Sequence, residues 1–235
     1  MMNLSKMFML AALPLASLLA LPQANASLMY GPLTVTVWNG TFNTGGASTN
    51  GVTDQASLPA PSATSVANFS YNGNINWVNN SATNTFANFF GADTAFISGY
   101  SSAAGLTESN FLNLLMSTPG ETGSAVNSYI EITGSWLGSD APGELGITSD
   151  DGACLYMSGS PVANLCHQDP QTNTLYTNTS TVSSGAFTLV YVESNGAPAD
   201  LVVTGAGPTP EPSSLMLLGT GVLGAAGFLR RRLFA

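Results

Sequence analysis

The stretch Glu144-Leu-Gly-Ile-Thr-Ser-Asp-Asp-Gly-Ala-Cys-Leu-Tyr-Met-Ser-Gly159 decides how this chain folds. It holds two short runs with apolar residues, 144–148 and 154–157, on either side of an Asp-Asp-Gly turn signal. This pattern predicts two β-strands that are joined by a tight connection through residues 149–152.

The two cysteines of the chain extend this unit. Cys154 and Cys166 lie on either side of the turn-forming cluster at 158–161. A hairpin centred there, with a second strand at 162–166, would place the two sulfurs opposite each other, so we predict a disulfide in an oxidising compartment. A catalytic or metal-binding cysteine pair is the alternative, although the chain has a single histidine, His167, to support it.

Composition extends the β prediction to most of the chain. Gly, Ser, Thr and Asn are abundant, the larger apolar residues come in short runs, and no long stretch keeps a helical period. We predict an all-β domain over residues 27–209, an antiparallel β-sandwich of the jelly-roll type. Further strands are expected at 33–38, 86–90, 128–137, 186–193 and 200–204.

Two segments of this domain depart from the strand pattern. Residues 108–116 predict a short helix, because Thr107 can cap it and Phe111, Leu112 and Leu115 share one helical face. Residues 43–68 have few large apolar side chains and predict a long surface loop.

The N-terminus has the features of a signal peptide. Lys6 precedes an apolar stretch at 7–21, and Ala24-Asn-Ala26 has the small-x-small form of a signal peptidase site. We therefore expect signal peptidase to remove residues 1–26.

The C-terminal tail has three parts in a fixed order. As a helix, its uncharged run at 215–229 would reach roughly 20–25 Å, close to the thickness of a bilayer's hydrocarbon core. Basic residues behind such a span stay on the cytoplasmic side, which puts the preceding domain outside; a buried core helix is the alternative. The parts are the triplet Pro210, Glu211 and Pro212, the apolar helix 213–229, and the basic cluster Arg230, Arg231 and Arg232.

This tail, residues 210–235, resembles the PEP-CTERM sorting signal of Gram-negative bacteria that produce exopolysaccharide. The resemblance implies an exosortase partner that cleaves near the triplet. It also implies a protein anchored in the inner membrane through its tail alone before processing, and then placed on the cell surface or in the extracellular matrix.

Charge limits what the domain can bind. All basic side chains, Lys6 and the three arginines of the tail, lie in the two targeting ends, and twelve of the thirteen carboxylates, all except Glu211, lie between them. Nucleic acid is excluded as a partner, because phosphate neutralisation by Lys and Arg supplies most of that binding. Neutral sugars and cations remain as ligands.

The neighbouring aspartates Asp150 and Asp151 are candidates for a cation site. On a regular strand their side chains would point to opposite faces. A cis peptide bond between them would turn both carboxylates to one side, where Ca²⁺, a hard ion that prefers oxygen ligands, would fit. The alternative is an Asp-Asp-Gly turn with solvated carboxylates.

A second resemblance supports the cation. Residues 144–159 and the later stretch 187–203 resemble the protective-antigen-type β-sandwich of yeast flocculins and fibro-slime proteins, with the match covering 144–203. In the lectins of that family a cis aspartate pair and a polar residue of a late loop bind calcium, which coordinates sugar hydroxyls. The resemblance implies metal ligands Asp150, Asp151 and Asn195, with Glu193 where the lectins have asparagine.

The departure at Glu193 matters for the ligand. A third carboxylate would tighten calcium but would take a coordination position that a sugar hydroxyl needs. Trp77, which lies among asparagines, is a candidate for stacking on sugar rings, whereas Trp136 ends an alternating strand and favours the core.

Three functions follow from these features. The first is a calcium-dependent binding module for neutral glycans of the exopolysaccharide. The second is a structural matrix component without a discrete ligand. The third is a glycosidase that uses Asp150 and Glu193 as its carboxylate pair, and we do not expect it, since nothing in the sequence requires the raised pKa that its acid needs.

Overall fold

The computed structural model describes residues 30–43, 47–48, 53, 55–118, 125–168 and 173–205. The signal peptide at 1–26 and the sorting tail at 210–235, with its helix and its motif residues, lie outside the described residues. Within the described ranges, no helix is both long and apolar enough to cross a membrane.

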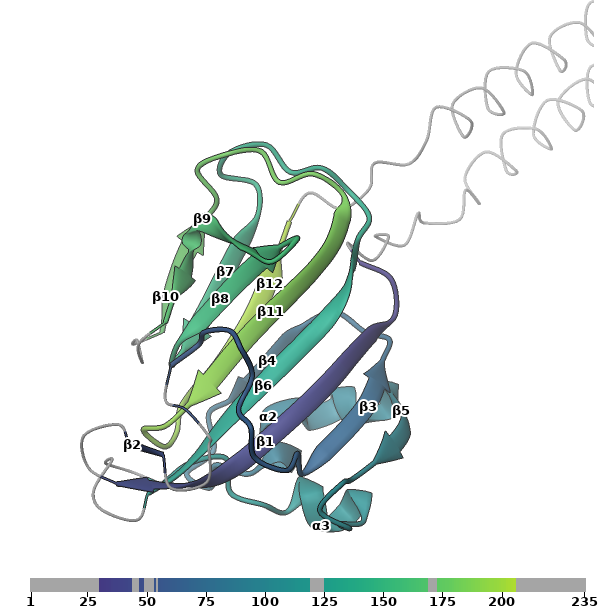
Figure 1. The fold of residues 1–235 in the computed structure, drawn as a ribbon, viewed down its shortest axis with the longest axis vertical. Helices are drawn as coiled ribbons and strands as arrows, with labels where there is room; N and C mark the ends of the chain where they lie inside the picture. The colour runs from purple at the N-terminus through teal and green to yellow at the C-terminus, as the bar shows by residue number, and fades with distance from the viewer. Residues whose placement is uncertain are drawn as a thin grey trace, which may run out of the picture. The chain divides into compact units, whose positions relative to one another are not determined.

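Two antiparallel sheets form a sandwich, which confirms the predicted fold class (Figure 1). The large sheet has the order β5-β3-β1-β6-β11-β8-β9, with β2 paired to β1, and the small sheet has the order β10-β7-β12-β4. The large-sheet strands are β1 (Leu33–Asn43), β2 (Ala47–Ser48), β3 (Ala67–Tyr71), β5 (Ile97–Ser101), β6 (Ala125–Trp136), β8 (Ala153–Met157), β9 (Ser160–His167) and β11 (Gly185–Glu193). The small-sheet strands are β4 (Asn76–Asn79), β7 (Gly146–Asp150), β10 (Thr174–Thr177) and β12 (Ala199–Thr204).

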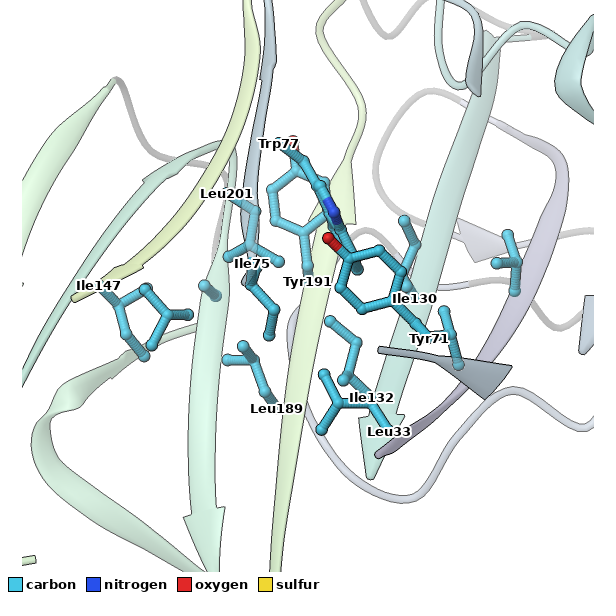
Figure 2. Packing of buried hydrophobic residues seen from close by; sticks show 14 of the residues in the cluster. Leu33, Tyr71, Ile75, Trp77, Ile130, Ile132, Ile147, Leu189, Tyr191 and Leu201 are labelled. Atoms are coloured by element: carbon cyan, nitrogen blue, oxygen red, sulfur yellow. The ribbon is translucent and has the colours of Figure 1, made fainter. Parts of the chain in front are cut away.

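The core fills the space between the sheets. Side chains alternate across each strand, so that one set of residues from every strand faces inward. Ile132 and Leu189 of the large sheet meet Ile147 and Leu201 of the small sheet in one buried cluster (Figure 2). Trp136 belongs to this cluster, as predicted, and its Nε1 donates a hydrogen bond of 2.6 Å to Asp140.

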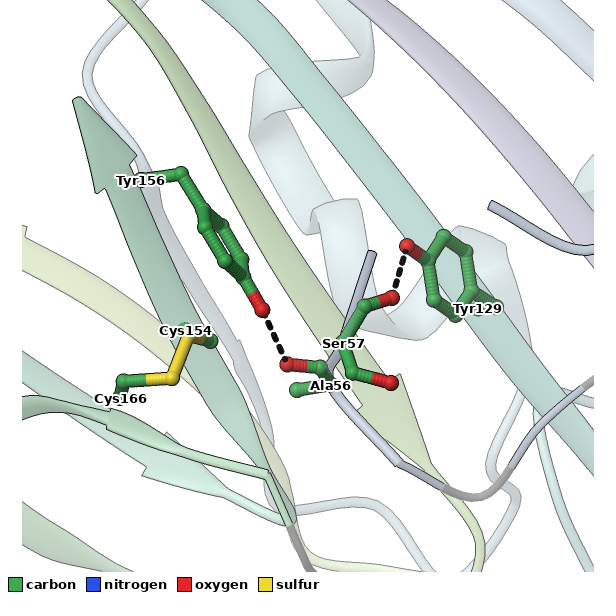
Figure 3. Close-up of a disulfide and its surroundings, with 6 residues drawn as sticks. All are labelled: Ala56, Ser57, Tyr129, Cys154, Tyr156 and Cys166. Atoms are coloured by element: carbon green, nitrogen blue, oxygen red, sulfur yellow. Dashed lines mark hydrogen bonds between the residues drawn. A yellow bond between two sulfur atoms is a disulfide. The ribbon is translucent and has the colours of Figure 1, made fainter. Parts of the chain in front are cut away.

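A strap covers the outer face of the large sheet. Residues 55–63 pack on a smaller apolar cluster that includes Tyr129 and Val190. The Tyr129 hydroxyl donates to the carbonyl of Ser57 at 2.7 Å (Figure 3), and Ala56 is fully buried. The predicted surface loop at 43–68 therefore contributes buried residues, although part of it lies outside the described residues.

The β8–β9 hairpin carries the disulfide. Cys154 and Cys166 are directly opposite each other in the register of the two strands, and their sulfurs are bonded (Figure 3). The hairpin turns at Ser158 and Gly159, where φ is +51° and +81°. The prediction of a disulfide across a turn at 158–161 is confirmed.

The prediction of a strand at residues 86–90 is wrong, because these residues form the helix α2 (Phe86–Phe90). The Thr85 hydroxyl caps it by accepting a hydrogen bond of 3.3 Å from the Asn88 backbone N–H. Phe86, Phe89 and Phe90 follow the i, i+3, i+4 spacing of one helical face, and all three are buried. The run of aromatic residues suggested a strand, whereas their spacing is helical.

The predicted helix at 108–116 is present and shorter than expected. α3 (Glu108–Leu112) is capped by Thr107, whose hydroxyl accepts from the Asn110 backbone N–H at 3.2 Å. Leu115 lies beyond its end and is 43% exposed, so it does not share the buried face of Phe111. A 3₁₀ segment, η1 (Gly91–Phe96), joins α2 to β5.

Trp77 is buried, which corrects its prediction as an exposed sugar-binding residue. In β4 the exposure alternates, so that Asn76 and Val78 face outward while Trp77 faces the core. Its ring packs edge-on against Phe90 and Tyr71, with centroid distances of 4.9 Å and 5.2 Å. The neighbouring asparagines suggested an exposed segment, but within β4 only Asn76 is exposed, while Asn79 is buried like Trp77.

We expect Trp77→Ala to lower the free energy of unfolding by about 3–5 kcal/mol, because it removes a fully buried aromatic side chain and leaves a cavity. Urea denaturation followed by circular dichroism measures this change. Leu137→Ala, at a position that is 51% exposed, is the control and should change the free energy by no more than about 0.5 kcal/mol. Wild-type stability in Trp77→Ala would contradict the packing described above.

Candidate cation site

Two connections between the sheets lie next to each other at one end of the sandwich. Asp150 is the last residue of β7, and Asp151 and Gly152 lead from there into β8 of the other sheet. Residues 194–198 lead from β11 to β12, again crossing between sheets. The backbone N–H of Val192 donates to the carbonyl of Gly152 at 2.9 Å, which fixes the two crossovers together.

The aspartate pair has the arrangement that the sequence predicted. The peptide bond between Asp150 and Asp151 is cis. The charge of Asp151 and a side-chain hydrogen bond between the two carboxyls help to raise the pKa of Asp150. The two carboxyls therefore share one side of the chain and do not diverge into solvent.

The late loop holds Asp151 in place. Its Oδ2 accepts hydrogen bonds from the backbone N–H groups of Ser194 and Asn195 at 2.7 Å and 3.1 Å, and its Oδ1 accepts from Asn195 Nδ2 at 3.0 Å. Asn195 is exposed, and its amide nitrogen faces Asp151. The structure thus brings together Asp150, Asp151 and Asn195.

Glu193 is linked to the site through the Tyr191 hydroxyl, which contacts both Glu193 and the Asp150 carbonyl. The residue is fully buried, and its Oε1 accepts from Ser117 Oγ at 2.7 Å and from Asn84 Nδ2 at 3.0 Å. Its Oε2 lies 2.9 Å from the Tyr191 hydroxyl. Both carboxylate oxygens are engaged in this buried network, and a role of Glu193 as a third metal ligand stays a prediction.

Asp200 is a site residue that the sequence reasoning missed. It pairs with Asp150 across the β7–β12 ladder and is 4% exposed. Asn173 Nδ2 donates to its Oδ2, while its Oδ1 is buried without a hydrogen-bond partner. The predicted strand at 200–204 contained the signal, because antiparallel pairing with the strand that ends at Asp150 brings the two aspartates together.

Burial raises the pKa values of all four carboxyls, and repulsion by neighbouring carboxyls adds to the rise for Asp150 and Glu193. Burial raises the pKa of Asp150 to about 6, with further contributions from the charges of Asp151 and Asp200. Burial also raises the pKa of Asp151 and of Asp200, and it raises that of Glu193 well above its usual range. No lysine or arginine lies between residues 27 and 209 to offset these charges, so protons or a bound cation must do so.

The donor set suits a hard cation. Among the residues that the structure describes, no three His, Cys, Asp or Glu side chains form a group that could hold a metal ion by themselves. An ion at this place would need the two aspartates, amide or carbonyl oxygens, and water or ligand hydroxyls. Such a shell contains oxygen only, which fits Ca²⁺ and does not fit Zn²⁺, and the unpartnered Asp200 Oδ1 adds negative charge beside it.

Comparison with protein families identifies the tail. The PEP-CTERM protein-sorting motif matches residues 208–232, which confirms the predicted sorting signal and indicates an exported protein that is anchored by its C-terminal tail before processing. A search among curated proteins finds no significant match.

Three solved structures are similar to this chain. One is described as a PA14 sugar-binding domain from an RTX adhesin; it has a TM-score of 0.44 and 15% identity, with 74% of this chain and 88% of that chain covered. The PA14 domain of the antifreeze protein MpAFP has the same score and identity, with 81% and 90% covered. A GH31 α-xylosidase from Xanthomonas citri has a TM-score of 0.31 and 10% identity, with 80% of this chain and 16% of that chain covered.

We expect the calcium-free protein to become less stable as the pH rises from about 4 to above 6. The pKa of Asp150 is raised from 3.8 to about 6 by folding, so the folded state keeps a proton that the unfolded state has already released, and stability falls as this proton is lost. Thermal melting at several pH values measures the slope.

The variant Asp150→Asn should show a shallower slope than the wild type over the same pH range. Glu108→Gln, an exposed carboxylate on α3, is the control and should keep the wild-type slope. Equal slopes in wild type and Asp150→Asn would show that Asp150 does not titrate as its surroundings require.

Proposed function

We propose that this chain is an exported surface or matrix protein whose sandwich domain binds Ca²⁺ at Asp150 and Asp151. Through that ion the domain binds a neutral glycan of the exopolysaccharide. The ligands of the ion are the two aspartate carboxylates and the amide oxygen of Asn195, with water or sugar hydroxyls at the remaining positions.

One observation carries the proposal. The two crossovers between the sheets bring Asp150 and Asp151 into contact with each other and hold Asp151 against the loop that carries Asn195. Carboxyls this close repel each other when both are ionised, and the domain supplies no basic side chain to offset them. A divalent cation is the simplest partner that offsets these two negative charges at neutral pH.

The position of Glu193 favours a sugar as the second ligand. A third carboxylate in the shell of the ion would take a position that a hydroxyl group needs. If Glu193 keeps its hydrogen bonds to Ser117 and Tyr191 when the ion binds, that position stays open. Calcium has room for 6–8 oxygen ligands, roughly twice what this protein supplies, so neighbouring hydroxyls of a neutral sugar can complete its shell.

The targeting ends explain how the domain reaches its ligand. Signal peptidase removes residues 1–26 and exosortase cleaves near Pro210, Glu211 and Pro212, which delivers the sandwich to the surface or matrix of a Gram-negative bacterium. The acidic, lysine-free domain avoids nucleic acid and phosphate there and stays soluble.

Glycoside hydrolysis is not proposed. It needs two carboxyls on either side of one bond. Glu193, the second carboxyl available to Asp150, is fully buried and hydrogen-bonded, so it cannot contact a substrate. If calcium does not stabilise the protein, the alternative is a structural matrix component without a discrete ligand.

We expect millimolar Ca²⁺ to raise the melting temperature of the protein at neutral pH, because a ligand that prefers the folded state stabilises it. The gain is about 2.7 kcal/mol when free calcium is a hundredfold above Kd. The double variant Asp150→Asn, Asp151→Asn should lose this response, while Glu108→Gln should keep it.

Differential scanning calorimetry with calcium and with a chelator measures the response, and Mg²⁺ serves as the comparison ion. Glycan binding is then tested by retention on immobilised exopolysaccharide of the producing organism, with and without chelator. If calcium leaves the melting temperature of the wild type unchanged, the proposed ion site is wrong.

A further inference from the structure

We infer that Glu193 is a positioning residue, which fixes both crossovers of the cation site through Tyr191 and Ser117 without contacting the ion. The inference rests on the proposed function, since it concerns the same site.

The first link runs from Glu193 to the aspartate pair. The Tyr191 hydroxyl lies 2.9 Å from Glu193 Oε2 and also donates to the backbone carbonyl of Asp150. The Tyr191 ring is fully buried and stacks on Phe89 of α2, with a centroid distance of 5.3 Å and an interplanar angle of 11°. The ring therefore cannot swing away, and its hydroxyl sets the position of the Asp150 backbone.

The second link runs from Glu193 to the late loop. Ser117 Oγ donates to Glu193 Oε1 at 2.7 Å and accepts from the backbone N–H of Gly196 at 2.9 Å. Gly196 directly follows Asn195, the residue that holds Asp151. One buried carboxyl is thus connected to both chain segments that form the site.

A third group fixes Glu193 itself. Asn84 Nδ2 donates to Glu193 Oε1 at 3.0 Å and to Ser117 Oγ at 2.7 Å. Asn84 Oδ1 in turn accepts from Asn79 Nδ2 at 2.9 Å, which ties the network to the last residue of β4. The network is buried throughout, and in such surroundings each lost hydrogen bond leaves an unsatisfied group.

Counting protons shows which substitution the network tolerates. The Tyr191 hydroxyl carries one proton but faces two acceptors, the Asp150 carbonyl and Glu193 Oε2, so one contact needs a proton from residue 193. Glutamine carries such a proton on its amide nitrogen and keeps an oxygen for Ser117 and Asn84. Glu193→Gln therefore preserves the network, although it would weaken the site if Glu193 were a metal ligand.

The test measures Kd for Ca²⁺ by isothermal titration on the full chain in detergent, at a temperature where circular dichroism shows every variant folded. We expect Glu193→Gln to keep Kd within about twofold of wild type. Tyr191→Phe and Ser117→Ala should each weaken calcium by about 10–100-fold, the usual effect of removing a group that orients a metal ligand.

Tyr129→Phe is the matched control. Tyr129 is also a buried tyrosine whose hydroxyl donates to a backbone carbonyl, that of Ser57 at 2.7 Å, but it does so on the outer face of the large sheet. Its loss should lower the melting temperature and leave Kd unchanged. A purely structural role of Tyr191 would give the same result as this control.

The outcomes are distinguishable. A loss of calcium affinity in Glu193→Gln would make Glu193 a ligand and overturn the inference, and so would a wild-type Kd in both Tyr191→Phe and Ser117→Ala. If the wild type itself binds no calcium, the proposed function fails and the inference falls with it. Tight binding by wild type and Glu193→Gln, with weak binding by the two network variants, supports both.

Discussion

Four carboxyl groups interact through their charges where the chain crosses twice between its sheets, in a domain that has no lysine or arginine to offset them. This excess of negative charge is the constraint on which the rest of the site depends. The β-sandwich can hold it because the crossovers supply backbone N–H groups for Asp151 and hydroxyl and amide donors for Glu193. Asp150 and Asp200 have fewer donors, and they are the groups for which a cation would matter most.

The four carboxyls differ in their surroundings. Glu193 is fully buried, and its hydrogen bonds reach Asn84 between β4 and α2, Ser117 before β6, and Tyr191 of β11. Asp150 is partly exposed, Asp200 pairs with it across the strands, and Asp151 contacts the exposed Asn195. In this arrangement Glu193 positions the chain segments of the site, while the aspartates are left to bind the ion. It also explains how Glu193 is compatible with a sugar ligand, whose hydroxyl oxygens need coordination positions on the ion.

Local patterns in the sequence predicted much of this, and pairing between distant segments accounts for what they missed. The Asp-Asp-Gly connection, the hairpin with its disulfide and the alternating strands around β6 and β11 depend on neighbouring residues. The burial of Trp77, the depth of Glu193 and the role of Asp200 depend on which strand lies beside which, and composition does not contain that register. The helix α2 was missed for a different reason, because its aromatic composition concealed a helical spacing.

The most direct test of the central claim is a crystal structure of the protein grown in calcium. The account predicts one ion with carboxylate oxygens of both Asp150 and Asp151 at about 2.3–2.6 Å, and the Asn195 amide oxygen in the same shell. Carboxyls that remain hydrogen-bonded to each other, with water or nothing between them and Asn195, would contradict it.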